Sequence, residues 1–257
     1  KIMNSNDRVA GVALTSGSAG TLGSGDYMKE VFPYSKIAVG EALQCPTLLN
    51  NGFGAHRIEG IGDKHVPWIH NVKNTDMVVA VDDNDSMNLL RLFNTENGQE
   101  YLKEQGVPEE FIKKLPLMGI SGIANMLTAI KMAKYYEMDE NDIIFTVFTD
   151  SMELYQSRLE EMEEEAGNYD RTEAAVDFHS NLRSIKTDNM EELTYESRKR
   201  IHNLKYYTWI EQQGKDMEEL NAQWYDYDNY WGNIHNKADK IDELIKEFNE
   251  RTGLLDE

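Results

Sequence analysis

Residues 9–30 read VAGVALTSGSAGTLGSGDYMKE, and this stretch decides the fold. The apolar run at 9–14 predicts a buried strand, and the segment from Thr21 to about Phe32 predicts a helix. A turn of small residues, Gly17 to Thr21, joins the two. Small side chains let backbone N–H groups approach an anion, and a helix N-terminus adds partial positive charge. The stretch therefore predicts a strand, turn and helix that bind a phosphate or carboxylate, with a plain tight turn as the alternative.

Strands and helices alternate through the first two-thirds of the chain. Apolar runs predict strands at 36–42, 76–81 and 143–148, and the last run is uninterrupted, as in strands buried on both faces. Amphipathic or apolar helical patterns occupy 86–105 and 121–136. This order predicts an α/β fold, with a parallel sheet that carries helices on both faces.

From about Ser151 onward no strand is predicted, and charged helical stretches dominate at 152–166, 171–185, 191–213 and 239–251. We therefore divide the chain into an α/β lobe at 1–165 and a helical C-terminal extension at 166–257. An aromatic group in the extension predicts packing on the lobe or on a second subunit, with a ligand box as the alternative. The group consists of Trp209, Trp224, Tyr225, Tyr227, Tyr230 and Trp231.

The composition excludes two classes of partner. The formal net charge is −20, from 46 acidic and 26 basic residues, which argues against a nucleic-acid partner. No window approaches the ~18 unbroken apolar residues of a membrane span. The single cysteine, Cys45, excludes an internal disulfide and fits a reducing compartment, so we expect a cytoplasmic protein.

The glycine-rich turn belongs to a longer pattern. Gly17-Ser18-Ala19-Gly20-Thr21 is followed by LGSGDYMKE at 22–30 and by KIAVGEA at 36–42. This succession resembles the phosphate-binding loop, helix and strand of the fold-type II pyridoxal-phosphate (PLP) enzymes, the family of cysteine synthase and tryptophan synthase β. The resemblance implies that PLP is the cofactor and that Gly17, Ser18, Ala19, Gly20 and Thr21 bind its phosphate.

Three further segments resemble the same family, in the family's order. They are HRIEGIG at 56–62, GISG at 119–122 and TDSMELY at 149–155. The resemblance implies that Gly60, Ile61 and Gly62 lie beside the PLP ring and that Ser121 opens a helix at the site. It also implies that the hydroxyl of Ser151 meets the pyridine nitrogen.

The chain departs from the family pattern at several points. Ala19 replaces a glycine of the phosphate loop, and Met152-Glu153-Leu154 replaces the usual Gly-Glu-Arg. An insertion at 71–76 and the long helical tail are not features of the simplest cysteine synthases. The tail and the segment at 41–71 resemble a larger bacterial subgroup of the family. The amino-acid substrate of the simpler enzymes therefore does not transfer to this chain.

The family's Schiff-base lysine and substrate-carboxylate loop lie upstream of the phosphate loop. Before that loop the only basic residues here are Lys1 and Arg8, so we expect no catalytic residue in this chain. PLP chemistry needs the lysine amine. The chain is therefore interpreted as the C-terminal portion of a longer polypeptide, inactive alone, which pairs with the missing N-terminal portion or forms a homodimer.

A hydroxyl at Ser151 leaves the ring nitrogen largely unprotonated, which favours β-elimination and β-replacement over transamination. The resemblance thus implies a lyase or β-replacement enzyme acting on a small amino acid. One alternative is a subunit of a PLP-dependent amino-acid thiolase or ammonia-lyase. Another is a non-catalytic PLP-fold remnant that acts through protein interaction. An open reading frame for a lysine-bearing domain directly upstream would favour the enzyme.

Three histidines, His56, His65 and His70, fall close together, and Asp63 or Cys45 could complete a metal site. Their loose spacing in a loop favours surface or channel histidines, so we expect no metal. A nucleophilic pair of Cys45 with a histidine is disfavoured because Pro46 follows the cysteine, which is typical of a turn. Lys64 is either an anion contact or, in the simpler interpretation, an exposed lysine.

Overall fold

The structure is a computed structural model that describes residues 6–15, 17–62 and 64–253. The chain forms two compact units, Lys1–Leu204 and Lys205–Glu257. The first unit contains the whole sheet, so it runs well beyond the lobe that the sequence analysis placed at 1–165. None of the described helices is both long and apolar enough to cross a lipid bilayer.

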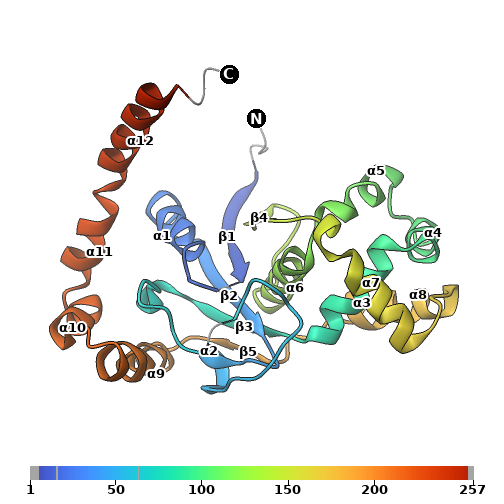
Figure 1. Ribbon diagram of the computed structural model, residues 1–257, viewed down its shortest axis with the longest axis horizontal. Helices are drawn as coiled ribbons and strands as arrows, with labels where there is room; N and C mark the ends of the chain where they lie inside the picture. The colour runs from blue at the N-terminus through green and yellow to red at the C-terminus, as the bar shows by residue number, and fades with distance from the viewer. Residues whose placement is uncertain (1–5, 16, 63, 254–257) are drawn as a thin grey trace. The chain divides into compact units, whose positions relative to one another are not determined.

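The first unit is built on one five-stranded sheet in the order β4-β1-β2-β3-β5 (Figure 1). Strands β1 to β4 are mutually parallel where they pair, which confirms the predicted α/β fold. The fifth strand pairs antiparallel with β3, so the sheet is mixed. The expectation of no strand after Ser151 was wrong, because three residues after the helical region add to the sheet edge. The strands are β1 (Arg8–Thr15), β2 (Lys36–Ala42), β3 (Met77–Val81), β4 (Asp142–Phe145) and β5 (Met190–Glu192).

Helices make up most of the remaining chain. Those of the first unit are α1 (Leu22–Val31), α2 (Thr47–Asn50), α3 (Asp83–Asn94), α4 (Glu96–Glu104), α5 (Glu109–Ile112), α6 (Ile120–Tyr135), α7 (Gln156–Ala166), α8 (Arg171–Asp177) and α9 (Tyr195–Lys205), whose last residue falls in the second unit. Short 3₁₀ turns are η1 (Val72–Asn74), η2 (Leu115–Leu117) and η3 (Met152–Tyr155), and π-helical turns are η4 (Phe178–Arg183) and η5 (Tyr206–Gln212). The second unit adds α10 (Met217–Tyr225), α11 (Tyr227–His235) and α12 (Ala238–Thr252).

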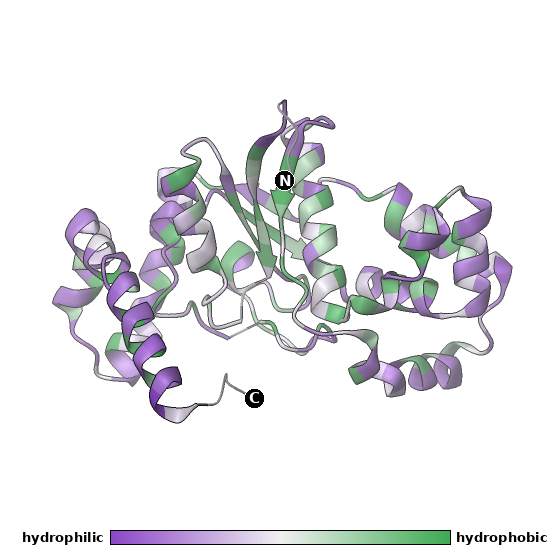
Figure 2. Cartoon of the chain, turned by 90° about the horizontal axis from the view of Figure 1, so that it is seen from above, coloured by the Kyte–Doolittle hydropathy of each residue, from purple (hydrophilic) through white to green (hydrophobic). Residues whose placement is uncertain are grey.

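Helices cover both faces of the sheet, as predicted. Side chains alternate between the faces of a strand, and two separate apolar clusters follow that alternation. One cluster joins Ala13 and Ala38 of the strands to α3 and α6, and the other joins Val12 and Val39 to Leu22 of α1. Figure 2 shows the apolar strands between these two helical layers.

Strand β4 is shorter and more exposed than predicted. The apolar run at 143–148 was expected to be buried on both faces, yet the strand ends at Phe145 and its residues are half-buried or exposed. The prediction was wrong because β4 is an edge strand that pairs with β1 alone. Phe145, Val147 and Phe148 remain 40%, 42% and 48% exposed.

The helix predicted at 86–105 is two helices. Thr95 ends α3 and caps α4, since its hydroxyl accepts a hydrogen bond from the N–H of Gly98 at 3.2 Å. Gly98 also lies so close to α3 that an added Cβ would stand 2.1 Å from the carbonyl oxygen of Leu92. The cap at Thr95 and the close approach of Gly98 to α3 therefore divide the predicted helix in two, although the hydrophobic pattern is continuous across 86–105.

A buried carboxylate near the start of β3 ties two helices of the same face to the sheet. Asp76 pairs with Lys29 of α1 at 2.6 Å and with Arg198 of α9 at 3.3 Å, and its carboxylate accepts from the N–H of Ile37 at 2.7 Å. These contacts fix two helices to neighbouring strands through one residue.

The predicted aromatic group falls in the second unit and contributes to its interior. Trp224 and Trp231 are buried, and the indole N–H of Trp231 donates to the carbonyl of Gln223 at 3.0 Å. Lys205 is fully buried and donates to the side-chain oxygen of Gln223 at 2.7 Å. Burial lowers the pKa of Lys205 well below its ordinary value.

Candidate functional site

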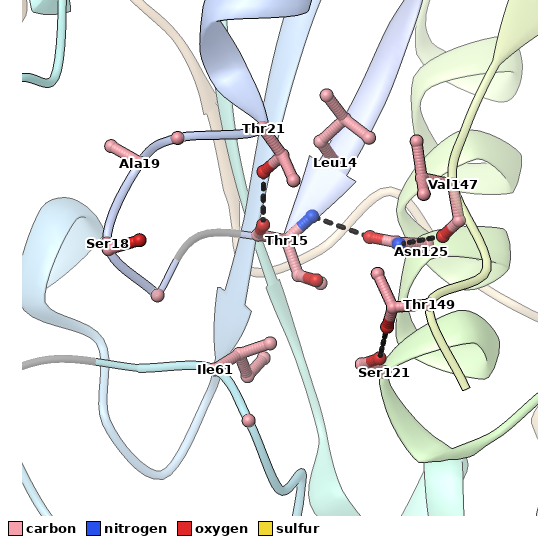
Figure 3. A pocket seen from close by; sticks show the side chains of 13 residues that line it. Leu14, Thr15, Ser18, Ala19, Thr21, Ile61, Ser121, Asn125, Val147 and Thr149 are labelled. Atoms are coloured by element: carbon pink, nitrogen blue, oxygen red, sulfur yellow. Dashed lines mark hydrogen bonds between the residues drawn. The ribbon is translucent and has the colours of Figure 1, made fainter. Parts of the chain in front are cut away.

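A cavity opens at the carboxyl ends of β1 and β4, where ligands bind in open α/β sheets (Figure 3). Its volume is about 150 Å³, whereas a single water needs only about 10–15 Å³, so it has room for a polyatomic ligand. Four segments supply its wall: the end of β1 with the glycine-rich loop, a second loop that contains Gly60 and Ile61, the start of α6, and the chain after β4. The lining residues are Leu14, Thr15, Gly17, Ser18, Ala19, Gly20, Thr21, Gly60, Ile61, Ser121, Asn125, Val147 and Thr149.

Unused backbone donors characterise the glycine-rich loop. Within the described residues, the N–H groups of Ser18, Ala19, Gly20 and Thr21 donate to no protein acceptor. A side chain on Gly17 would narrow the gap to the second loop, since an added Cβ would lie 3.1 Å from the carbonyl oxygen of Gly60. The loop thus offers amides and the space for an acceptor to approach them.

The N-termini of two helices lie at this cavity. Thr21 directly precedes α1, a helix of 10 residues, and Ser121 is the second residue of α6, a helix of 16 residues. Neither helix has a side-chain cap. The first amides of α1 donate to loop carbonyls, from Leu22 to Ala19 and from Gly23 to Gly20, both at 3.2 Å, but the dipoles of both helices favour negative charge at their N-termini. The cavity is therefore suited to an anion.

Asn125 connects the opposite sides of the cavity. Its side-chain oxygen accepts from the N–H of Thr15 at 2.5 Å, and its amide donates to the carbonyl of Val147 at 2.7 Å. Asn125 is 4% exposed, so both bonds are shielded from water. One side chain thereby holds the end of β1 at a fixed distance from the segment after β4 (Figure 3).

Two hydroxyls face each other across the lower part of the view in Figure 3. The oxygen atoms of Ser121 and Thr149 lie 3.3 Å apart, and both residues line the cavity. Among the described lining residues none has a carboxylate, an imidazole or an amine. The cavity therefore offers backbone amides, hydroxyls and one carboxamide, and a bound anion would meet dipoles rather than a formal positive charge.

Most of the predicted cofactor-binding residues come together here. The loop from Gly17 to Thr21, Gly60, Ile61 and Ser121 all line the cavity. Gly62 and Ser151 lie outside its wall. Gly62 has a φ of +81° and lies beside the ring of His56, and Ser151 has extended backbone just before η3. The roles assigned to all ten residues stay predictions.

Sequence reasoning did not select five of the lining residues: Leu14, Thr15, Asn125, Val147 and Thr149. For Asn125 a signal was present. Ser121, Asn125 and Thr128 are spaced i, i+4 and i+7 in α6, so they share one face of the helix. That polar face is turned toward the sheet, where Thr128 stands against Gly40.

Asp150 lies next to the cavity wall without lining it. Its carboxylate accepts from the phenol of Tyr155, and its carbonyl accepts from the N–H of Gly119 at 3.0 Å. Burial and this bond to Asp150 raise the pKa of Tyr155, so the phenol stays protonated and keeps donating. The bonds hold the segment after β4 against the start of α6.

The histidines of the predicted loop do not gather into a metal site among the described residues. His70 pairs with the hydroxyl of Thr75 at 3.0 Å, and Cys45 is buried with its sulfur 3.8 Å from the hydroxyl of Thr47. Asp63 lies outside the described residues. The ammonium of Lys64 stands 5.7 Å from the ring centre of Phe53.

The fold and cavity define a class: an α/β protein with a glycine-rich loop of unused backbone amides at the carboxyl edge of its parallel strands. No family model matches the chain. The chain is 30% identical over 142 residues to cysteine synthase B of Campylobacter jejuni, and 28% identical over 144 residues to a probable cysteine synthase of Bacillus subtilis. These matches confirm the resemblance to the cysteine synthase family over the part of the chain that they cover.

The chain spans less than half the length of the relatives that it matches. The matches span 55–56% of this chain and 40% of each relative. Among solved structures, a cysteine synthase from Entamoeba histolytica has a TM-score of 0.49 and 20% identity, covering 67% of this chain and 46% of that one. A hydrogen sulfide-producing enzyme from Fusobacterium nucleatum has a TM-score of 0.47 and 26% identity, covering 67% and 45%.

Proposed function

We propose that this chain is the cofactor-binding portion of a PLP-dependent lyase or β-replacement enzyme that acts on a small amino acid. The observation that carries the proposal is the row of unused amides from Ser18 to Thr21 at a neutral cavity. The family resemblance names PLP as the anion, and the fit of the cavity to a phosphate supports that assignment.

The residues divide the work between binding and orientation. The loop amides and the N-terminus of α1 receive the phosphate, because both present partial positive charge to it. Asn125 keeps the loop and the segment after β4 at a constant separation. PLP, when bound, supplies an electron-withdrawing ring to the α-carbon of the amino acid.

The neutral wall supports elimination and replacement over transamination. Transamination gains from a carboxylate that keeps the pyridine nitrogen protonated. The cavity offers the hydroxyls of Ser121 and Thr149 instead, and the predicted partner of the nitrogen, Ser151, is also a hydroxyl. None of these groups ionises near neutral pH, so the ring nitrogen would stay largely unprotonated.

The proposal assigns the amine for the chemistry to another polypeptide segment. Among the described lining residues there is no lysine. We therefore expect this chain to bind PLP through its phosphate and to have no turnover until a lysine-bearing portion is added. The half-exposed edge of β4 offers that portion unpaired backbone groups beside the cavity wall.

Calorimetric titration of the isolated chain tests the binding step. We expect saturable binding of PLP, competition by inorganic phosphate, and no saturable binding of pyridoxal, which lacks the phosphate. Equal affinities for PLP and pyridoxal would contradict recognition of the cofactor through its phosphate. Absence of all binding would favour the non-catalytic remnant.

Two matched glycine variants locate the site. Gly17→Val places a side chain against the second loop and is expected to weaken PLP binding by about tenfold or more, or ~1.4 kcal/mol. Gly23→Val is the control, because an added Cβ there meets no atom within 4 Å. Equal affinities for the two variants would place PLP elsewhere.

Co-expression tests the catalytic half of the proposal. A cysteine synthase segment that carries the family's lysine, expressed together with this chain, is expected to restore β-elimination on a small amino acid. Activity of this chain alone, with a lysine of its own reduced onto PLP by borohydride at one site, would contradict the division of labour.

A further inference from the structure

Helix α12 carries an apolar stripe that nothing in its own unit covers. Ile241, Leu244, Ile245 and Phe248 are spaced i, i+3, i+4 and i+7, so they form one face of the helix. Their exposed fractions are 50%, 51%, 52% and 59%. No residue of α12 is buried in the described chain.

Four large neighbouring apolar side chains on one helix face are unusual for a solvated surface, since isolated ones are the common case. The rest of α12 is charged, with Lys240, Asp242 and Glu247 among its exposed residues. A helix with one apolar and one charged face gains most of its stability by packing the apolar face on a partner. The stripe thus points to a partner that contacts α12 along its length.

We propose that the partner is α12 of a second copy of this chain, packed antiparallel around a two-fold axis between Leu244 and Ile245. The stripe is symmetric about that point. Antiparallel pairing therefore places Ile241 against the partner's Phe248 and the two central residues against each other. Such a contact is isologous and closes on itself, and it places the two helix dipoles side by side and antiparallel.

The charged flanks of the stripe match this arrangement. On one side lie Lys240 and Glu247, seven residues apart, and antiparallel pairing brings each near the opposite charge of the second copy. On the other side lie Asp242 and Asn249, which meet as a carboxylate and an amide rather than as like charges. Both flanks are therefore compatible with self-pairing, although the chain as a whole carries a charge of −20.

The contact is small, and this sets its strength. One helix of 15 residues buries less area than the ~800 Å² per partner of a standard interface. We therefore expect a reversible dimer with a dissociation constant on the order of micromolar, which weakens as salt screens the flanking charges.

Sedimentation velocity of the full chain over a concentration series tests the stripe. Leu244→Glu buries a charge twice in each dimer and is expected to weaken association by about a hundredfold or more. Lys246→Glu is the matched control, because it changes charge on the same helix away from the stripe. A full chain that stays monomeric, or a dimer that Leu244→Glu leaves intact, would overturn the proposal.

Charge exchange tests the flank. Lys240→Glu and Glu247→Lys are each expected to weaken association about tenfold, since each creates two like-charge contacts by symmetry. The double variant is expected to return to within about threefold of the natural chain. A double variant as weak as the singles contradicts the pairing of these residues.

Disulfide trapping tests the direction. In the antiparallel arrangement Ile245→Cys lies beside its own copy, whereas Ile241→Cys lies about 10 Å along the axis from its copy, too far for a disulfide. The native Cys45 is buried and does not interfere. We expect oxidation to link Ile245→Cys alone, and linkage of Ile241→Cys instead would indicate parallel helices and overturn the proposal.

Discussion

Ala19 sits in the glycine-rich loop with a φ of +66°, in the left-handed region. For a residue with a Cβ this conformation costs roughly 1–2 kcal/mol, and glycine avoids that cost. The family pattern has glycine at this position. The loop therefore adopts its conformation at a local cost in stability that a glycine at this position would avoid.

Ala19→Gly is expected to raise the free energy of unfolding by about 1 kcal/mol, because it removes the Cβ from a left-handed residue. Urea unfolding measures the change. Ala38→Gly serves as the control: Ala38 is fully buried in β2, and the same substitution there is expected to destabilise. A destabilised Ala19→Gly variant would contradict the backbone assignment.

Two substitutions at Asn125 test its role in binding and its role in folding. Asn125→Asp keeps an oxygen for the N–H of Thr15 and brings a negative charge to a cavity that binds an anion. We expect PLP affinity to fall by about tenfold or more. Asn125→Leu removes both bonds and is expected to cost about 2 kcal/mol of stability. Calorimetric titration and urea unfolding separate the two effects.

At the scale of elements, Asp76 is the clearest stability test. It is paired with Lys29 and Arg198, and Asp76→Ala would leave Lys29 partly buried beside no carboxylate. Loss of one partner of a buried pair costs about 3–5 kcal/mol, whereas an exposed pair is worth less than ~1 kcal/mol. Glu109→Ala, which breaks the exposed pair with Lys113, is the matched control. Equal losses in the free energy of unfolding for Asp76→Ala and Glu109→Ala, measured with urea, would contradict this prediction.

Glu41 near the end of β2 gives the fold a pH dependence. Burial raises the pKa of Glu41 to about 7 although the carboxylate accepts from the N–H groups of Leu48 and Leu49, both at 2.9 Å. Because the folded pKa is raised, this group contributes full stability below its ordinary pKa of 4.5 and loses it as the pH rises through about 7.

Urea unfolding from pH 5 to pH 8 tests that behaviour. The natural chain is expected to lose up to roughly 3 kcal/mol relative to Glu41→Gln as the pH rises, since Gln does not ionise. The difference between the two proteins isolates Glu41 from other titrating groups. A constant difference across this range would show that Glu41 is ionised throughout.

Strands and helices in the first half of the chain could be predicted because each has its own local signal. The run KIAVGEA predicts β2 at its observed bounds, and the small residues at 17–21 predict the loop. The edge position of β4 and the existence of β5 could not be predicted in this way. The position of a strand at a sheet edge and its antiparallel pairing depend on which other strand lies beside it. The hydrophobicity of the strand's own residues does not indicate that neighbour.

The same limit applies to the site. The motifs identified the loops that border the cavity, because the local backbone conformation of these loops requires glycines. Thr149 escaped selection because its role arises only when the segment after β4 packs beside α6, whereas Asn125 lies on a polar face of α6 that the sequence could have indicated. The motif selected Ser151, whereas Thr149 of the same segment lines the cavity. Motif spacing places a segment, and packing then decides which side chain of it lines the cavity.

At the scale of the whole molecule, the central claim is that the loop amides bind the phosphate of PLP. Amide resonances of the ¹⁵N-labelled full chain report on this directly. Added PLP is expected to shift the amides of Ser18, Ala19, Gly20 and Thr21 most, and inorganic phosphate is expected to shift the same group. If PLP leaves these amides unmoved while it shifts others, the phosphate binds elsewhere and the account is wrong.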